Sequence, residues 1–180
     1  DNSVRVAKFA MATDASKANS AVTPGILALA NAPRGSGEDS FLKGIVVQFD
    51  LTFTVKAWTE AERYHFFDIV TSQSTMHRIT KFDLDDRYIE YTDERAIDIM
   101  KELVAKYNEM TDPIEKQGQY LRILYTNPTG CKLTAGITPN YQQLKTIYAQ
   151  RRNHRLPEWR VFCEWIESLP MAEEFICGKK

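Results

Sequence analysis

The sequence lacks an excess of charge of either sign. Its 180 residues include 23 Lys and Arg against 24 Asp and Glu, which gives a formal net charge of −1. Proteins that bind nucleic acid over a broad surface usually carry a basic excess, so this balance argues against that class. Apolar residues make up 43% of the chain, more than a disordered chain has. We therefore expect one folded domain over residues 1–180.

Cysteine and long apolar runs are also scarce. Three cysteines, Cys131, Cys163 and Cys177, form no C-x-x-C pair, which argues against a disulfide framework and a zinc cluster. The longest apolar stretch, residues 25–32, is shorter than the roughly 20 residues of a membrane span, and the first residues do not resemble a signal peptide. No histidine lies in an H-x-x-x-H pattern. We expect a cytoplasmic protein with no membrane partner and no metal site.

The periodicity of apolar residues predicts both strands and helices. Alternation predicts strands at residues 4–10 and 44–55. A capping box at Thr59-Glu-Ala-Glu62 predicts a helix that runs to about Gln73. N-cap and proline signals predict further helices at residues 24–32, 93–109, 112–125, 138–153 and 158–168, with a brief strand or extended link at 131–136. The expected fold class is α+β, with helices outnumbering strands.

Charge is segregated along the chain although its sum is close to zero. Residues 83–99 hold seven acids against two bases, whereas residues 140–160 hold five bases against one acid. Clustered guanidinium groups, as in Arg151-Arg-Asn-His-Arg155, favour bidentate capture of phosphate. Three interpretations stay open: a solvated helix face, an anion site, or two segments that face each other within a subunit or across an oligomer.

Five short segments follow one another in a characteristic order and spacing. They are Gly37-Glu-Asp-Ser40-Phe41, Gln73-Ser-Thr-Met76-His77-Arg78, Asp86-Arg87-Tyr88, Asn140-Tyr-Gln-Gln-Leu144 with Arg151 eleven positions after Asn140, and Glu158-Trp-Arg160. Over residues 10–160 this succession resembles the motifs of the flavin-dependent thymidylate synthases. The resemblance implies a mixed α+β fold with a small, mainly antiparallel sheet. It also implies a homo-oligomer, either a dimer or a tetramer.

The same resemblance implies an activity and a set of site residues. The activity is the methylation of deoxyuridylate, or a reaction of a related nucleotide, with hydride supplied by FAD while the protein positions the partners. The implied nucleotide contacts are Gln73, Arg87 and Arg151, and Arg151 is also the implied catalytic residue because a fixed cation stabilises charge on the uracil ring. The implied flavin contacts are His77, Arg78 and Asn140.

Several positions depart from the family pattern. Met76 stands where the family has an arginine that contacts flavin, and Leu84 replaces a glutamate in the nucleotide loop. Asp85 and Asp86 replace a serine and a glycine there. Two carboxylates beside a substrate phosphate would repel it by several kcal/mol unless cations neutralise them. Because a fold persists while its chemistry changes, these departures predict an altered ligand on the same scaffold.

The alternative hypothesis is a non-catalytic module that binds a protein or a nucleic acid, for example an inhibitor encoded by a phage or another mobile element. It would use the same scaffold and the basic residues 140–160. The predicted partner contacts are Arg151, Arg152, His154 and Arg155. Flavin absorbance of the purified protein separates the two hypotheses, because only the enzyme needs the cofactor.

Overall fold

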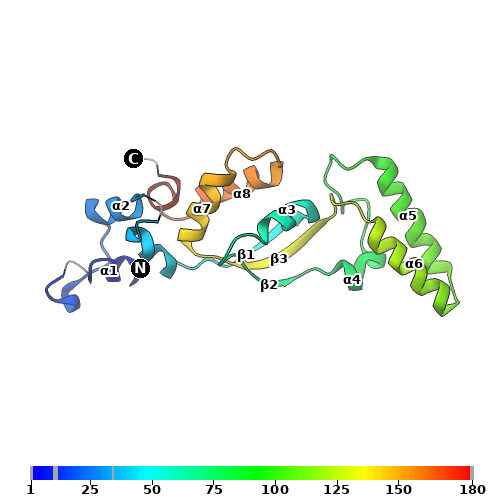
Figure 1. Ribbon diagram of the computed structural model, residues 1–180, viewed down its shortest axis with the longest axis horizontal. Helices are drawn as coiled ribbons and strands as arrows, with labels where there is room; N and C mark the ends of the chain where they lie inside the picture. The colour runs from blue at the N-terminus through cyan, green and yellow to red at the C-terminus, as the bar shows by residue number, and fades with distance from the viewer. Residues whose placement is uncertain (1, 10–11, 34, 179–180) are drawn as a thin grey trace. The chain divides into compact units, whose positions relative to one another are not determined.

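The computed structural model describes residues 2–9, 12–33 and 35–178 and divides into two compact units (Figure 1). The terminal unit comprises the residues up to 49, residues 62–68 and the residues from 137 onward. The central unit comprises Asp50–Ala61 and Ile69–Gly136. That the whole chain behaves as one domain stays a prediction.

A three-stranded antiparallel sheet belongs mostly to the central unit. Its strands are β1 (Phe49–Thr54), β2 (Asp68–Ser72) and β3 (Lys132–Thr138), in the order β1-β3-β2. Helix α3 (Val55–Ala61) follows β1 directly, and the indole Nε1 of Trp58 donates to the carbonyl of Leu133 at 3.0 Å. Strand β3 therefore lies between two edge strands, and a partly buried hydrogen bond joins it to α3.

A pair of long helices forms the rest of the central unit's core. Helices α5 (Glu94–Glu109) and α6 (Pro113–Thr126) lie side by side in Figure 1, after the short elements α4 (Thr75–Arg78) and η4 (Ile79–Lys81). Asp93 and Asp112 cap the two helices by accepting backbone N–H groups, as the sequence predicts. The buried cluster between these elements contains Ile79, Leu84, Tyr88, Met100, Ile123 and Cys131.

Helices build the terminal unit. They are α1 (Asn2–Val6), η2 (Ala15–Lys17), α2 (Pro24–Ala30), η3 (Glu38–Gly44), α7 (Tyr141–Arg151), α8 (Pro157–Glu167) and η5 (Glu173–Cys177). Helix α7 packs against η3, α8 and η5, with Leu144 and Ile147 fully buried. Trp159 and Ile166 bury the inner face of α8. None of the helices among the described residues is long and apolar enough to cross a membrane.

Two of the expected strands need correction. Residues 2–6 form helix α1, so a strand over 4–10 is wrong for the described part of that range, and residue 10 lies outside the described residues. The strand expected over 44–55 is confined to β1, because η3 occupies the chain up to Gly44 and only a single bridge at Val46 precedes the strand.

The helix expected from Thr59 to Gln73 is also wrong. Thr54, not Thr59, is the N-cap, because its hydroxyl accepts from the N–H of Ala57 at 3.1 Å. The Thr59 hydroxyl instead donates to the carbonyl of Lys56 at 2.7 Å, inside a helix that has already begun. The β-branched run Ile69-Val70-Thr71 then forms β2, as such residues favour strands.

The helix expected from residue 138 starts later. Thr138 is the last residue of β3, and Asn140 caps α7 by accepting from the N–H of Gln143 at 2.9 Å. The helix expected over 158–168 is confirmed as α8, with Pro157 at its first position.

Candidate functional site

Two of the expected nucleotide contacts meet at the sheet of the central unit. Nη1 of Arg87 donates to Oε1 of Gln73 at 3.2 Å and to the carbonyl of Lys132 at 3.3 Å. The same Gln73 oxygen accepts from the N–H of Thr134 at 3.1 Å. Gln73 follows the last residue of β2, and both of its partners lie on or contact β3. The sheet therefore fixes the side chains of Gln73 and Arg87 against each other.

The guanidinium of Arg87 has hydrogen-bond acceptors for only some of its N–H groups. Its carbon lies 4.1 Å from the ring centre of Phe82, so one face of the cation is covered by an aromatic ring. Its Nε is buried and has no hydrogen-bond partner among the described residues. A buried donor of this kind calls for an acceptor, and a guanidinium suits a planar or tetrahedral oxyanion.

The acidic loop near Arg87 is partly neutralised. Lys101 of α5 forms an ion pair and a short hydrogen bond with Asp85. That hydrogen bond, helped by the negative charges of Asp85, Asp98 and Asp83, raises the pKa of the Lys101 ammonium against the opposing effect of desolvation. Asp86 is exposed and has no ion-pair partner in the part of the chain that the structure describes. One of the two carboxylates expected to repel a phosphate thus has its own counter-ion.

The expected flavin contacts of the central unit lie on the short helix α4. His77 and Arg78 are both exposed, and neither side chain has a hydrogen-bond or ion-pair partner within the described ranges. Met76, beside them, is also exposed, and its carbonyl accepts a short hydrogen bond from the hydroxyl of Tyr120 on α6. The contact with α6 therefore holds α4 by its backbone, and the side chains of His77 and Arg78 stay available for a ligand.

Arg151 lies in a cage of aromatic rings in the terminal unit. Its Nε donates to the Tyr64 hydroxyl at 2.7 Å, and its Nη1 lies 2.7 Å from Nε2 of His154. The guanidinium carbon is 4.8 Å from the ring centre of Trp159 and 5.4 Å from that of Tyr64. The Tyr64 hydroxyl in turn donates to Oε1 of Gln150 at 2.8 Å. Arg151 is therefore rigidly held, and Tyr64 is a partner that sequence reasoning missed.

The other bases of residues 140–160 do not form one continuous face. Arg160 donates to the carbonyls of His154 and Arg155 at 2.7 and 3.0 Å, so it closes the turn between α7 and α8. Arg152 is exposed, with its guanidinium carbon 5.9 Å from the ring centre of Tyr148, and Arg155 is exposed as well. The exposed part of the predicted partner-binding set is the pair Arg152 and Arg155.

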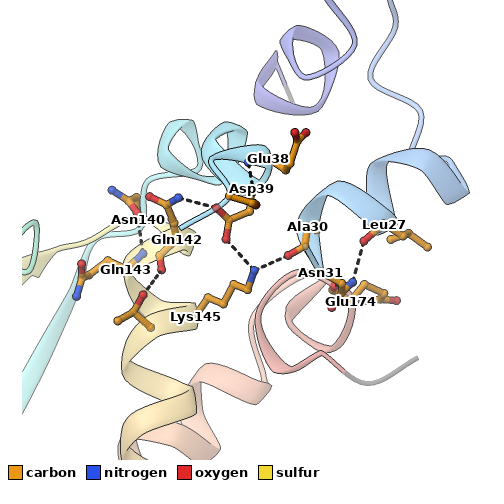
Figure 2. A network of polar contacts seen from close by, with 12 residues as sticks. Leu27, Ala30, Asn31, Glu38, Asp39, Asn140, Gln142, Gln143, Lys145 and Glu174 are labelled. Carbon is orange, nitrogen blue, oxygen red and sulfur yellow. Dashed lines mark hydrogen bonds and ion pairs between the residues drawn. The ribbon is translucent and has the colours of Figure 1, made fainter. Parts of the chain in front are cut away.

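Lys145, the remaining base, lies in a polar network with a side chain that is only 13% exposed (Figure 2). Its ammonium donates to Oδ2 of Asp39 at 2.7 Å and to the carbonyl of Ala30 at 2.6 Å. Oδ1 of Asp39 accepts from Nε2 of Gln142 at 2.8 Å. Burial alone would raise the pKa of Asp39, but the hydrogen bonds from Lys145 and Gln142 outweigh it, so the pKa lies below its ordinary value.

This network fixes helix α7, which begins after Asn140 and ends at Arg151. Figure 2 shows Asn140 at the start of α7, close to Gln142 and Gln143 of the same helix. The Asn140 side-chain oxygen is used as the N-cap, while its amide nitrogen has no partner among the described residues. The residue expected to contact flavin is thus oriented by capping, and its amide NH2 group stays available as a donor.

Comparison with known proteins identifies this arrangement of elements. No family model and no curated protein matches the sequence. A crystal structure of thymidylate synthase X (ThyX) from Helicobacter pylori with FAD and dUMP aligns with a TM-score of 0.71 at 12% identity and covers 99% of this chain and 93% of that one. The chain has the fold of the flavin-dependent thymidylate synthases. The expected α+β class with a small antiparallel sheet is confirmed.

A second structure of ThyX from the same organism, a flavin-dependent thymidylate synthase complexed with FAD and dUMP, gives a TM-score of 0.68 at 11% identity. It covers 97% of this chain and 90% of that one. Identities this low establish the ThyX fold and leave the ligands of this chain to its own residues.

Proposed function

We propose that this chain binds deoxyuridylate or a related nucleotide and, with FAD, acts on it as a divergent flavin-dependent methyltransferase. The observation that carries the proposal is the contact between Gln73 and Arg87, two residues 14 positions apart that a nucleotide site of this fold would need together. The two ThyX structures of the same fold contain FAD and dUMP. Their ligands support the choice of nucleotide and cofactor.

The Gln73 and Arg87 pair is suited to a nucleotide for chemical reasons. The Gln73 oxygen accepts from both Arg87 and Thr134, so the amide nitrogen is directed away from them and can donate to a carbonyl or a sugar oxygen. The stacked and half-buried guanidinium of Arg87 is preorganised, so little entropy is lost when it binds a phosphate. Together they supply one neutral donor and one cation to a monophosphate.

Each unit also holds donors of the kinds that an FAD molecule can accept from. His77 and Arg78 offer an imidazole and a guanidinium for phosphate or ring-carbonyl oxygens, and Asn140 offers an amide N–H group. Met76 can offer apolar contact only. When bound, the flavin would supply hydride transfer. The cage of Tyr64, Trp159 and His154 keeps Arg151 in one geometry, which is what a cation needs if it is to stabilise charge on a uracil ring.

The exposed pair Arg152 and Arg155 keeps the alternative function open as a proposal. A protein or nucleic-acid partner with an acidic or phosphate group would find two guanidinium groups near the end of α7. Reversing both charges would abolish capture of such a partner and leave nucleotide binding at Arg87 unchanged. Unaltered capture would reject this version of the alternative.

Calorimetric titration with dUMP tests the main proposal. Arg87→Met should weaken binding by about 10- to 150-fold, because a hydrogen bond to a charged group is worth roughly 1.5–3 kcal/mol. The matched control is Arg63→Met, which removes an exposed arginine of the terminal unit and should leave affinity unchanged. Equal affinity of the Arg87 variant and the wild type would contradict the nucleotide site.

The absorbance spectrum tests the cofactor separately. Purified protein, or protein incubated with FAD and then freed of unbound cofactor, should keep a visible flavin band. His77→Ala combined with Arg78→Ala should lose that band. Protein that stays colourless after incubation would reject the flavin while leaving the nucleotide titration to decide the rest.

A further inference from the structure

Lys132, the first residue of β3, is fixed against Arg87 by two hydrogen bonds that run in opposite directions. The N–H of Lys132 donates to the carbonyl of Arg87 at 2.7 Å, and Nη1 of Arg87 donates to the carbonyl of Lys132 at 3.3 Å. Lys132 belongs to none of the five segments whose order and spacing resemble the family motifs. Only the three-dimensional structure places it beside Arg87.

The side chain of Lys132 belongs to the polar face of the sheet. The hydroxyl oxygen of Thr134 lies 2.8 Å from that of Thr52 on β1, so these two side chains share a face. Lys132 precedes Thr134 by two positions, and side chains two positions apart on a strand point to the same face. Ala135 and Ile137, which alternate with them, are buried. The Lys132 side chain is therefore on the side of the sheet that carries hydroxyl groups, not in the core.

The ammonium group of Lys132 is a cation to which the chain gives no counter-ion. The residue is half-buried, and its side chain has no hydrogen-bond or ion-pair partner within residues 2–9, 12–33 and 35–178. Lys101, which serves the acidic loop of the same unit, is instead paired with Asp85. Holding a charge partly out of water without a partner costs free energy, and an anion bound beside Lys132 would recover part of that cost.

The charge of a phosphate monoester calls for more than one cation. Such a group carries about −1.5 to −2 at pH 7, because its second pKa is about 6. Arg87 supplies one positive charge, and the exposed carboxylate of Asp86, its neighbour in the sequence, opposes it. A guanidinium binds phosphate oxygens as a fork, while an ammonium on the flexible lysine stem reaches the same anion as a point charge. Arg87 and Lys132 together match the charge of the dianion.

We propose that Lys132 is the second cation of the phosphate subsite and that, with Arg87, it selects ligands that bear a phosphate monoester dianion. The inference rests on the proposed function, because it adds a binding residue to the same nucleotide site. Lys132 offsets the repulsion expected from Asp86. The Gln73 amide, which contacts Arg87 from the end of β2, is left for the sugar or the base of the nucleotide.

Calorimetric titration of the full chain with dUMP, deoxyuridine and inorganic phosphate tests this assignment. Lys132→Met should weaken dUMP binding by about 10- to 150-fold and remove the binding of inorganic phosphate, because a hydrogen bond to a charged group is lost. Deoxyuridine, which lacks the phosphate, should bind the wild type and Lys132→Met equally. Lys132→Arg keeps the charge and should stay within about fivefold of the wild type. Lys106→Met, at an exposed position of α5, removes the same charge and should change nothing.

The pH dependence separates contact with the dianion from a structural role of Lys132. The loss caused by Lys132→Met should shrink as the pH falls below about 6, where the phosphate takes up its second proton. The unfolding midpoint should stay within about 2 °C of the wild type, because the ammonium has no partner in the chain to lose. An equal loss at pH 5 and pH 8 would overturn the contact with the dianion.

The outcomes for this inference and for the proposed function differ. Equal dUMP affinity of the wild type and Lys132→Met would overturn the role of Lys132 and leave the nucleotide site intact. A wild type that binds inorganic phosphate through Lys132 but does not bind dUMP would reject the nucleotide and support the anion subsite. A wild type that binds neither would reject both.

Discussion

The ion pair between Asp39 and Lys145 predicts a large and specific loss of stability. The two side chains are 7% and 13% exposed. Asp39→Ala removes the carboxylate and leaves the largely buried ammonium to neutral partners such as the carbonyl of Ala30. Breaking one partner of a buried pair costs about 3–5 kcal/mol. At about 2–4 °C per kcal/mol for a chain of this size, the unfolding midpoint should fall by roughly 6–20 °C.

A double-mutant cycle measured by urea unfolding isolates the interaction. Lys145→Met leaves the Asp39 carboxylate without its counter-ion, with Gln142 and a backbone N–H as hydrogen-bond donors, and should also be costly. The combined variant removes both buried charges, so it should be more stable than the sum of the two losses predicts, by at least about 2 kcal/mol. A loss below about 1 kcal/mol for Asp39→Ala, or additive losses in the cycle, would refute the buried-pair argument.

Acid should act through the same carboxylate. Because the folded pKa of Asp39 lies below its unfolded value, the pair stabilises the fold fully above the unfolded pKa of about 4, and this stability is lost as the pH falls through the folded pKa. Asp39→Ala should therefore flatten the fall in the free energy of unfolding below about pH 4. If the free energy of unfolding falls equally steeply below pH 4 in the wild type and in Asp39→Ala, other carboxylates cause the fall.

Two further predictions follow from local contacts. Thr54→Ala should lower the free energy of unfolding by about 1 kcal/mol, because it removes the N-cap of α3. Thr59→Ala should lower it by less than about 0.5 kcal/mol. Equal losses in urea unfolding would contradict the corrected helix start. Burial, with a smaller contribution from the charge of Glu167, raises the pKa of the Cys163 thiol to about 12. Native Cys163 should therefore resist a thiol reagent at pH 8 until the protein unfolds, while half-buried Cys177 reacts first.

The long helices were predictable because their signals are local. Asp93 and Asp112 lie directly before α5 and α6, and Pro157 is the first residue of α8. A few neighbouring residues therefore determine where each helix starts. The error over residues 59–73 has a local cause as well. Both Thr54 and Thr59 are residues of a type that caps a helix. The sequence pattern does not show that the helix starts directly at the end of a strand.

Contacts at long sequence separation were not predictable in the same way. Tyr64 and Arg151 are 87 positions apart, and no motif relates them, so the cage around Arg151 could be found only in three dimensions. Gln73 and Arg87 were identified through their spacing within a family pattern. Their contact required β2, although the segment before Gln73 was expected to be helical.

Counting charges along the chain overstates what residues 140–160 offer to a partner. Lys145 is committed to Asp39, Arg151 to Tyr64 and His154, and Arg160 to the turn carbonyls. Five available bases in a row would bind along a polyanion and release several counterions. Arg152 and Arg155, the exposed guanidinium groups of this segment without a hydrogen-bond partner among the described residues, can neutralise about two phosphates. The structure therefore reduces a broad basic face to one compact anion contact. Arg152 and Arg155 are too few to bind nucleic acid in general, but they suffice to bind a single phosphate or carboxylate group.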